Sequence, residues 1–199
     1  MRIFDIFKKP VTKPLPVYPT IKTGEIPPAS AILFYGGNRL TELAGNRLYK
    51  HPYKPPAFHA AFYIEDGLIL NVGKFKTIET IESELRSTRR VDVIIYKGLS
   101  VDTVEALKKS AYLDLDKPKA GIQLPTYAIT DYMRFGLRWF KPSKKDFCSE
   151  NVVEIYAKYG IRISDQESYN SAPWDLAEFA EANLDLCELR TLYVGADFK

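Results

Sequence analysis

Two side chains in this sequence, a cysteine and a histidine, have the chemistry of a nucleophile and its base. Cys148 stands in DFCSENVVEIYAKYG, where a helical pattern begins at or just before it and Asp146 is a plausible N-cap. The first turn of a helix carries partial positive charge and unpaired N–H groups, which lower the pKa of a thiol. The N–H groups around Cys148 and Ser149 can also bind the oxyanion that forms on an attacked carbonyl. Taken alone, the position also suits a small buried cysteine at a helix start.

A β-hairpin is predicted around the residues EDG, with His59 at its open end. The segments HAAFYI and LILNVG flank this loop, and a three-residue loop that ends in glycine is a common hairpin connection. Ile64 then pairs with Leu68, and further from the loop His59 and Asn71 become diagonal neighbours on one face of the hairpin. A two-residue loop would place these two side chains on opposite faces.

An amide beside an imidazole has a catalytic use. The oxygen of Asn71 can accept a hydrogen bond from one ring nitrogen of His59, which fixes the tautomer and the orientation of the ring. The other nitrogen is then free to exchange a proton with a nucleophile. The hairpin alone also suits an ordinary histidine at a strand end, followed by an asparagine that favours a turn.

The remaining histidine and cysteine have no such context. His51, in the proline-rich segment YKHPYKPP, is interpreted as an exposed loop residue, and Cys187 as a core residue. Two histidines without a nearby acidic cluster, and two cysteines without CxxC spacing, predict neither a metal site nor a disulfide framework. We expect no cofactor.

Length and composition limit the remaining classes of protein. The 199 residues suit one domain, or one domain with an arm, and a hydrophobic content of 46% can form a real core. Basic residues are scattered beside acidic ones at a net charge of only +3, which indicates a solvated surface and not a nucleic-acid-binding face. No apolar run approaches the ~20 residues of a membrane span. We expect no nucleic acid and no membrane span.

The N-terminal segment does not read as a signal peptide. The stretch MRIFDIFKKP is interrupted by Asp5 and lacks both a long apolar region and a small-residue cleavage site. We therefore expect synthesis in a reducing cytoplasm, with association with a virion left open.

Prolines divide the chain into an arm and a domain. Six of the thirteen prolines fall before residue 29, which predicts an extended arm over residues 1–28 and a folded domain over residues 29–199. The arm can lie across the domain, dock on a protein partner or stay mobile, and the sequence does not choose among these.

Strands and helices are mixed in the domain without a strict βαβ alternation, which predicts an α+β fold with an antiparallel sheet. Besides the hairpin, strands are expected at AILFYGG (31–37), VDVIIYKG (91–98) and CELRTLYVG (187–195). A helix or a broken helical turn is expected at residues 38–50, and helices at 80–87, 100–115, 127–140, 146–160 and 171–184.

Specific residues are expected to begin or end these helices. Thr80, Ser100 and Ser171 are candidate N-caps, with Pro173 in the first turn of the last helix, and Gly160 closes the helix that begins near Cys148. In the helix after Ser100, the residues expected to face inward are Val101, Val104, Leu107 and Ala111.

Taken together, AILFYGGNRLTEL, PYKPPAFHAAFYIEDGLILNVG and DFCSENVVEIYAKYGI follow one another in an order that resembles a known family. That family is the YiiX-like, circularly permuted papain-fold hydrolases, which are relatives of the NlpC-type cell-wall peptidases. Its members have a strand and a helix, then a histidine on a hairpin strand, a polar residue on the next strand, and a cysteine in a CSE-like helix start. The resemblance covers about residues 29–162.

The resemblance implies a circularly permuted papain-like fold in which an antiparallel sheet packs with helices. It makes His59 the general base and Cys148 the nucleophile. Asn71 stands where the family often has Glu, and such an amide orients an imidazole but stabilises an imidazolium less than a carboxylate does. The sequence PAS also replaces the Gly-Asp that is common before the family's first strand.

The implied activity is a cysteine hydrolase that cleaves an amide or peptide bond, with bacterial peptidoglycan as substrate. Tyr127 and Tyr35 are candidate walls of its substrate groove, and the N–H groups near Ser149 would hold the oxyanion. Two alternatives remain. One is a lipid-acting acyl hydrolase or acyltransferase. The other is a structural or docking component of a phage tail or another assembly, with a vestigial site and an arm that binds a protein partner.

Overall fold

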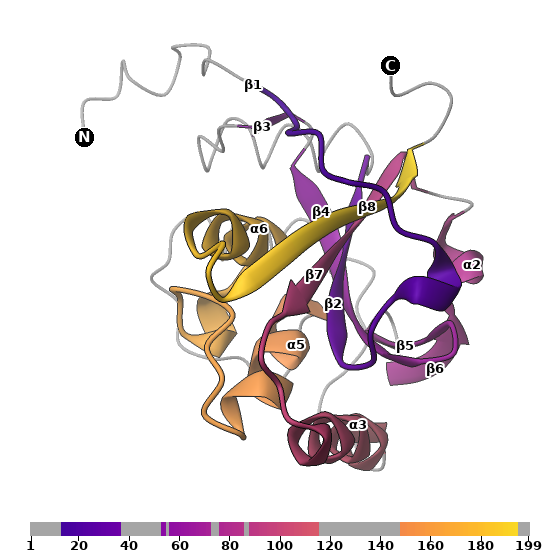
Figure 1. The fold of residues 1–199 in the computed structure, drawn as a ribbon, viewed down its shortest axis with the longest axis vertical. Coiled ribbons are helices and arrows are strands. Elements are labelled where there is room, and N and C mark those ends of the chain that lie inside the picture. Colours follow the sequence, from indigo (N-terminus) through magenta and orange to yellow (C-terminus); the bar gives the residue numbers. More distant parts are fainter. Residues whose placement is uncertain are drawn as a thin grey trace, which may run out of the picture.

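The computed structural model describes residues 13–36, 53–54, 56–72, 76–85, 88–115 and 148–194. Its centre is a six-stranded antiparallel sheet in the order β6-β5-β4-β2-β7-β8 (Figure 1). The strands are β2 (Ser30–Tyr35), β4 (Ala57–Glu65), β5 (Leu68–Val72), β6 (Lys76–Thr80), β7 (Arg90–Tyr96) and β8 (Cys187–Val194). The expected α+β fold with an antiparallel sheet is confirmed, and β6 is an addition that the sequence analysis did not predict.

Short helices and a small second sheet complete the described part of the chain. The helices are α2 (Ile81–Leu85), α3 (Val101–Leu115), α5 (Cys148–Ala157) and α6 (Pro173–Ala182), with 3₁₀ turns η2 (Thr23–Glu25) and η4 (Ser168–Asn170). Strands β1 (Lys13–Pro14) and β3 (Tyr53–Lys54) pair in parallel. Among the described residues, no helix combines the length and apolar character that crossing a membrane requires.

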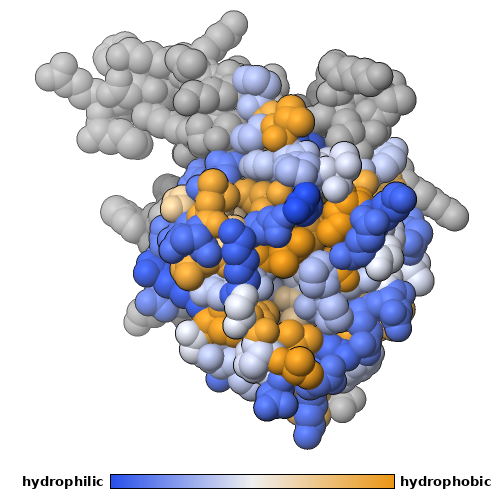
Figure 2. Space-filling view, in the orientation of Figure 1, coloured by the Kyte–Doolittle hydropathy of each residue, from blue (hydrophilic) through white to orange (hydrophobic). Residues whose placement is uncertain are grey.

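Both faces of the sheet are covered, which is why β2 is buried along its whole length. One core cluster, which includes Leu33 and Phe62, packs against α3, α5 and α6. The other, which includes Ile32 and Tyr63, packs against α2 and part of the N-terminal arm. A strand buried on both faces reads as a continuous apolar run rather than an alternating one. On the face shown in Figure 2, hydrophobic and hydrophilic residues are interspersed among the described residues.

The turn of the β4–β5 hairpin differs from its prediction. Asp66 and Gly67 form a two-residue turn, with Glu65 paired to Leu68. Both turn residues have positive φ, 49° and 79°. Two successive left-handed residues are typical of the type I′ turn, whose twist matches that of the flanking strands. The expected three-residue loop was therefore wrong.

A β-bulge restores the predicted register beyond this turn. Ile64 is the extra residue, and on its far side Tyr63 pairs with Ile69 and Phe62 with Leu70, as predicted. A bulge places two residues opposite one, so it cancels the one-residue slip that the shorter turn would cause.

Helix α3 begins as predicted, but one of the residues expected to face inward, Val101, is exposed. The N–H of Thr103 donates to the hydroxyl of Ser100 at 3.2 Å, which confirms the cap. Leu107 and Ala111 are buried, whereas Val101 is 79% exposed. Val101 lies six residues before Leu107, which at 3.6 residues per turn places it about a third of a turn away from the buried stripe.

Helix α6 has a different cap from the one predicted. Its N-cap is Ala172, and the N–H of Ala172 donates to the carboxylate of Asp175 at 2.8 Å. The hydroxyl of Ser171 is engaged instead with Ser164, at 2.9 Å. The expected Pro173 in the first turn is confirmed.

The described part of the arm lies across the domain. Thr191 of β8 donates its N–H to the carbonyl of Pro19 at 2.9 Å and accepts from the N–H of Ile21 at 3.0 Å, so the arm adds a parallel bridge to the edge of the sheet. Ile26 is buried in the second core cluster. Residues 15–28 therefore pack on the domain, which is one of the three arrangements left open above.

A buried polar cluster fastens the arm. The ring of Tyr18 lies over the guanidinium of Arg90, 5.2 Å from its centroid, and the Tyr18 hydroxyl donates to Glu181 of α6. Arg90 in turn donates to Asp92 at 2.8 Å, and both side chains are almost fully buried. One aromatic residue of the arm thus joins β7 and α6.

Candidate active site

His59 lies near the start of β4, where the strand is irregular. It pairs with Phe34 of β2, while the next pair joins Tyr35 to Ala57, so Phe58 is an extra residue. The imidazole is partly buried, and its ring centroid lies 5.3 Å from that of Phe34. Bulges of this kind increase the local twist and re-aim the side chains beside them.

Asn71, on the neighbouring strand β5, holds the imidazole. Its Oδ1 lies 2.8 Å from Nε2 of His59, and its side chain is 7% exposed. This contact confirms that the two residues share one face of the hairpin. Since Nε2 is engaged with the amide, Nδ1 is the nitrogen that remains for a thiol.

Cys148 is the first residue of α5, and so lies in the first turn, where the sequence analysis expected it. The helix packs on β4 and runs to Ala157, and the turn after it closes at Gly160, whose φ is 70°. The N–H of Gly160 donates to the carbonyl of Ala157 at 3.0 Å, and that of Ile161 donates to Tyr156 at 3.2 Å. This pair of bonds is the Schellman motif, which confirms Gly160 as the C-terminal stop.

The thiol and the imidazole are in hydrogen-bond contact, and each changes the pKa of the other. Burial acts to lower the pKa of His59, but the charge of Cys148 and the hydrogen bond to it, helped by Glu84 and Asn71, raise that pKa above its ordinary value. Folding thus brings together two residues that are far apart in the chain.

The pKa of Cys148 moves in the opposite direction. Burial acts to raise it, but the charge of His59 and the hydrogen bond from His59, followed by the backbone N–H groups of Ala60 and Ser149, bring the thiol pKa below its ordinary value. A raised imidazole pKa and a lowered thiol pKa together favour a thiolate–imidazolium pair.

A carboxylate that the sequence analysis did not assign to the site lies behind Asn71. The Nδ2 of Asn71 donates to Oε1 of Glu84 at 2.7 Å. Glu84 belongs to α2, and an acidic residue in the first turn of a helix is so common that it carries no catalytic signal by itself. Only the position of α2 beside β5 distinguishes Glu84 from other acidic residues in a first helical turn.

No protein-family model matches the sequence, and no curated protein matches it significantly.

Three further residues were predicted to belong to the site: Ser149, Tyr35 and Tyr127. The hydroxyl of Ser149 is buried and donates to the carbonyl of Ser171 at 2.5 Å, so only its backbone N–H faces the sulfur. Tyr35 is 2% exposed and lies in the core beside Arg90, which corrects the expectation that it is a groove wall. Tyr127 lies outside the described residues.

Several further predictions also fall outside the described residues. They are the elements at 38–50 and 127–140, the Asp146 cap and the exposed position of His51. Cys187 is fully buried, as expected of a core residue. Within the described ranges, no group of three or more His, Cys, Asp or Glu residues is arranged to hold a metal ion.

A buried ionic network ties α5 to its neighbours one turn after Cys148. Asn151 donates to the carboxylate of Asp114 on α3, and the same carboxylate lies 2.5 Å from the ammonium of Lys76 on β6. Lys76 pairs with Val72, the residue after Asn71. The network therefore links the helix that carries the thiol to the strands beside the amide.

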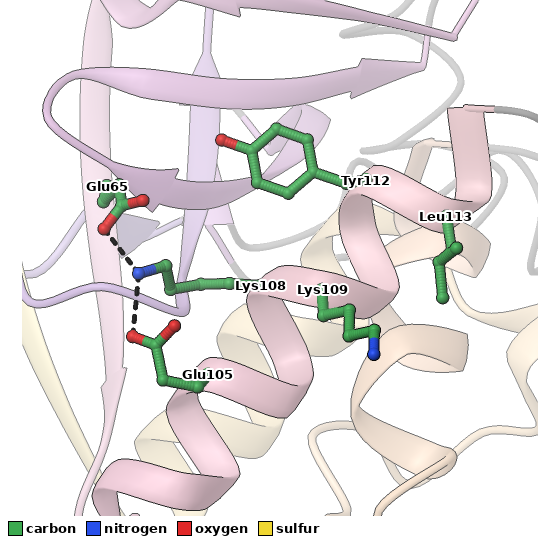
Figure 3. A pocket seen from close by; sticks show the side chains of 6 residues that line it. All are labelled: Glu65, Glu105, Lys108, Lys109, Tyr112 and Leu113. Atoms are coloured by element: carbon green, nitrogen blue, oxygen red, sulfur yellow. Dashed lines mark hydrogen bonds and ion pairs between the residues drawn. The ribbon is translucent and has the colours of Figure 1, made fainter.

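A pocket at the other end of β4 is unrelated to this site. Figure 3 shows Lys108 of α3 between Glu65 and Glu105, with ion-pair distances of 2.5 and 2.8 Å. Glu65 is the last residue of β4, whereas His59 lies near its first. The pocket holds neither a thiol nor an imidazole among its lining residues.

Proposed function

We propose that this protein is a cysteine hydrolase that cleaves an amide or peptide bond, with Cys148 as nucleophile, His59 as general base and acid, and Asn71 as the residue that orients His59. The observation that carries the proposal is the hydrogen-bonded contact between a first-turn thiol and an imidazole that an amide holds from behind. The order His, Asn, Cys along the chain, together with an antiparallel sheet, supports a circularly permuted papain-like fold of the YiiX-like kind.

In the acylation step, the thiolate of Cys148 attacks the carbonyl carbon of the substrate and forms a C–S bond. The negative charge moves to the carbonyl oxygen, where N–H groups of the first turn of α5, such as that of Ser149, can donate to it. As the tetrahedral species collapses, the C–N bond breaks and the imidazolium of His59 gives its proton to the leaving amine.

In the deacylation step, neutral His59 accepts a proton from water while the water oxygen attacks the thioester carbonyl. The C–S bond then breaks and the acid product leaves, and the thiolate and the imidazolium are restored. Asn71 accepts a hydrogen bond from Nε2 throughout, so the ring keeps Nδ1 toward the sulfur while the proton is exchanged.

Bacterial peptidoglycan is the proposed substrate class, on the basis of the family resemblance in the sequence. Its cross-linking peptides supply amide bonds that a thiolate can attack. Delivery to the cell wall by a virion is part of the same proposal.

Digestion of purified peptidoglycan tests the proposal. The wild type, Cys148→Ala and Cys187→Ala are compared, and the soluble fragments are identified by mass spectrometry. We expect new peptide termini with the wild type and with Cys187→Ala, and none with Cys148→Ala. Equal release by all three proteins would contradict the enzymatic role of Cys148 on this substrate.

A further inference from the structure

The hydrogen bonds around Asn71 determine which way its amide points. The ionised carboxylate of Glu84 can only accept hydrogen bonds, so the group of Asn71 that faces it, 2.7 Å away, must be the NH₂ donor. The amide oxygen is then the atom that faces His59 at 2.8 Å, and it can only accept. Nε2 of His59 must therefore carry a proton.

We propose that Glu84 is a positioning residue that acts through Asn71 to keep the proton on Nε2 of His59 and Nδ1 turned toward Cys148. The proposal deepens the function proposed above and rests on it only through the contact between Cys148 and His59. It extends the site from three residues to a chain of four, contributed by α5, β4, β5 and α2.

Glu84 also supplies the charge that Asn71 lacks. An amide orients an imidazolium without neutralising it, whereas a carboxylate two hydrogen bonds away stabilises the positive charge electrostatically. The charges of Cys148 and Glu84 both act to raise the pKa of His59. On the neighbouring strand β6, Lys76 is paired with Asp114, and Glu79 accepts from the hydroxyl of Thr77.

The position of Glu84 is built into the fold. The first residue of its helix, Ile81, is fully buried, and the N–H of Ile81 donates to the carbonyl of Gly67 at 2.8 Å. At the other end, the hydroxyl of Thr88 donates to the backbone carbonyl of Glu84 at 2.7 Å. The β4–β5 turn and the segment after α2 thus hold the carboxylate behind Asn71.

The first test is the tautomer of His59 in the wild-type protein, measured by ¹⁵N NMR of the ring nitrogens above the pKa of the ring, with His51→Gln used for assignment. We expect a proton on Nε2. A neutral ring with its proton on Nδ1 would overturn the proposal, and this measurement needs neither a substrate nor a variant of the site.

The second test removes the charge. Glu84→Gln is compared with Glu82→Gln, which neutralises an exposed residue on the same helix. The rate of alkylation of Cys148 by iodoacetamide is followed against pH, with the labelled peptide identified by mass. We expect the midpoint for Glu84→Gln to rise by about one pH unit. The midpoint for Glu82→Gln should stay at the wild-type value. The midpoint for Glu84→Asp should lie close to the wild-type value, because aspartate keeps the negative charge.

The outcomes separate this inference from the proposed function. A wild-type alkylation midpoint near 8.5, which is about the pKa of an ordinary thiol, would contradict the proposed function. The tautomer of His59 would still test the role of Glu84. A low wild-type midpoint that Glu84→Gln leaves unchanged would overturn the role of Glu84 and leave the proposed function standing.

Discussion

Nε2 of His59 and Oδ1 of Asn71 lie 2.8 Å apart on the adjacent strands β4 and β5, and β4 contains two bulges. The bulge at Ile64 restores the register that the two-residue turn would shift, and the bulge at Phe58 lies directly before the histidine. The contact therefore depends on two local irregularities of one strand rather than on regular pairing alone.

The amide of Asn71 should matter more for reactivity than for folding. In Asn71→Ala the imidazole loses its hydrogen bond, worth about 1.5–3 kcal/mol for a charged partner. We expect alkylation of Cys148 at neutral pH to fall by about 10- to 100-fold, measured with iodoacetamide under pseudo-first-order conditions. Urea unfolding serves as the control, since a loss of stability large enough to unfold the variant would explain the same result without any role in orienting His59.

The pH profile of Cys148 should show an activated thiol. The lowered pKa of Cys148 means that the thiolate appears at a lower pH than in an ordinary cysteine, whose pKa is about 8.5. The raised pKa of His59 keeps the imidazolium present as the pH rises through this range. We therefore expect the alkylation midpoint of the wild type to lie below that of an ordinary thiol.

Replacing the imidazole should reverse this effect. In His59→Ala the thiol keeps its buried environment but loses the positive charge, so its pKa should rise and the alkylation midpoint should move to 8.5 or above. An unchanged midpoint in His59→Ala would show that the first turn of α5 alone activates the thiol.

The arm should contribute to the stability of the domain through Tyr18. Tyr18→Ala removes the cation–π contact with Arg90 and the hydrogen bond to Glu181, which together are worth about 2–3 kcal/mol. The free energy of unfolding in urea should fall by this amount. The matched control is Val17→Ala, since Val17 is 96% exposed and its replacement should change the stability by no more than ~0.5 kcal/mol. Equal effects of the two substitutions would mean that the arm is not fastened by Tyr18.

Two positions on α3 should differ strongly despite their similar chemistry. Leu107→Ala creates a cavity in the core and should cost about 2–5 kcal/mol of unfolding free energy. Val101→Ala changes a residue that is 79% exposed and should have an effect within ~0.5 kcal/mol. Thermal or urea unfolding of both variants checks which residues of this helix face the sheet.

The site illustrates how much of its geometry local patterns can determine. His59 and Asn71 were placed on one face from a hairpin pattern, and the register in the body of the strands agrees with that prediction. The reason was only partly right, since the turn has two residues and the bulge at Ile64 supplies the correction. The Asp66-Gly67 pair is itself a signal for a two-residue type I′ turn. The bulge at Ile64 has no such local signal, and only the strand pairing in the folded protein shows it.

The sequence by itself determined the local elements whose signals lie within a few residues: the apolar run of β2, the Ser100 cap, the Gly160 stop and the place of Cys148 in the first turn of α5. It also identified two reactive side chains. Only the tertiary structure decided that the thiol meets the imidazole, that Glu84 stands behind Asn71, and that Tyr35 is buried rather than exposed. These contacts join segments distant in the chain, and the packing of helices on the sheet decides them, whereas the Ser100 cap and the Gly160 stop are made by residues close together in the chain.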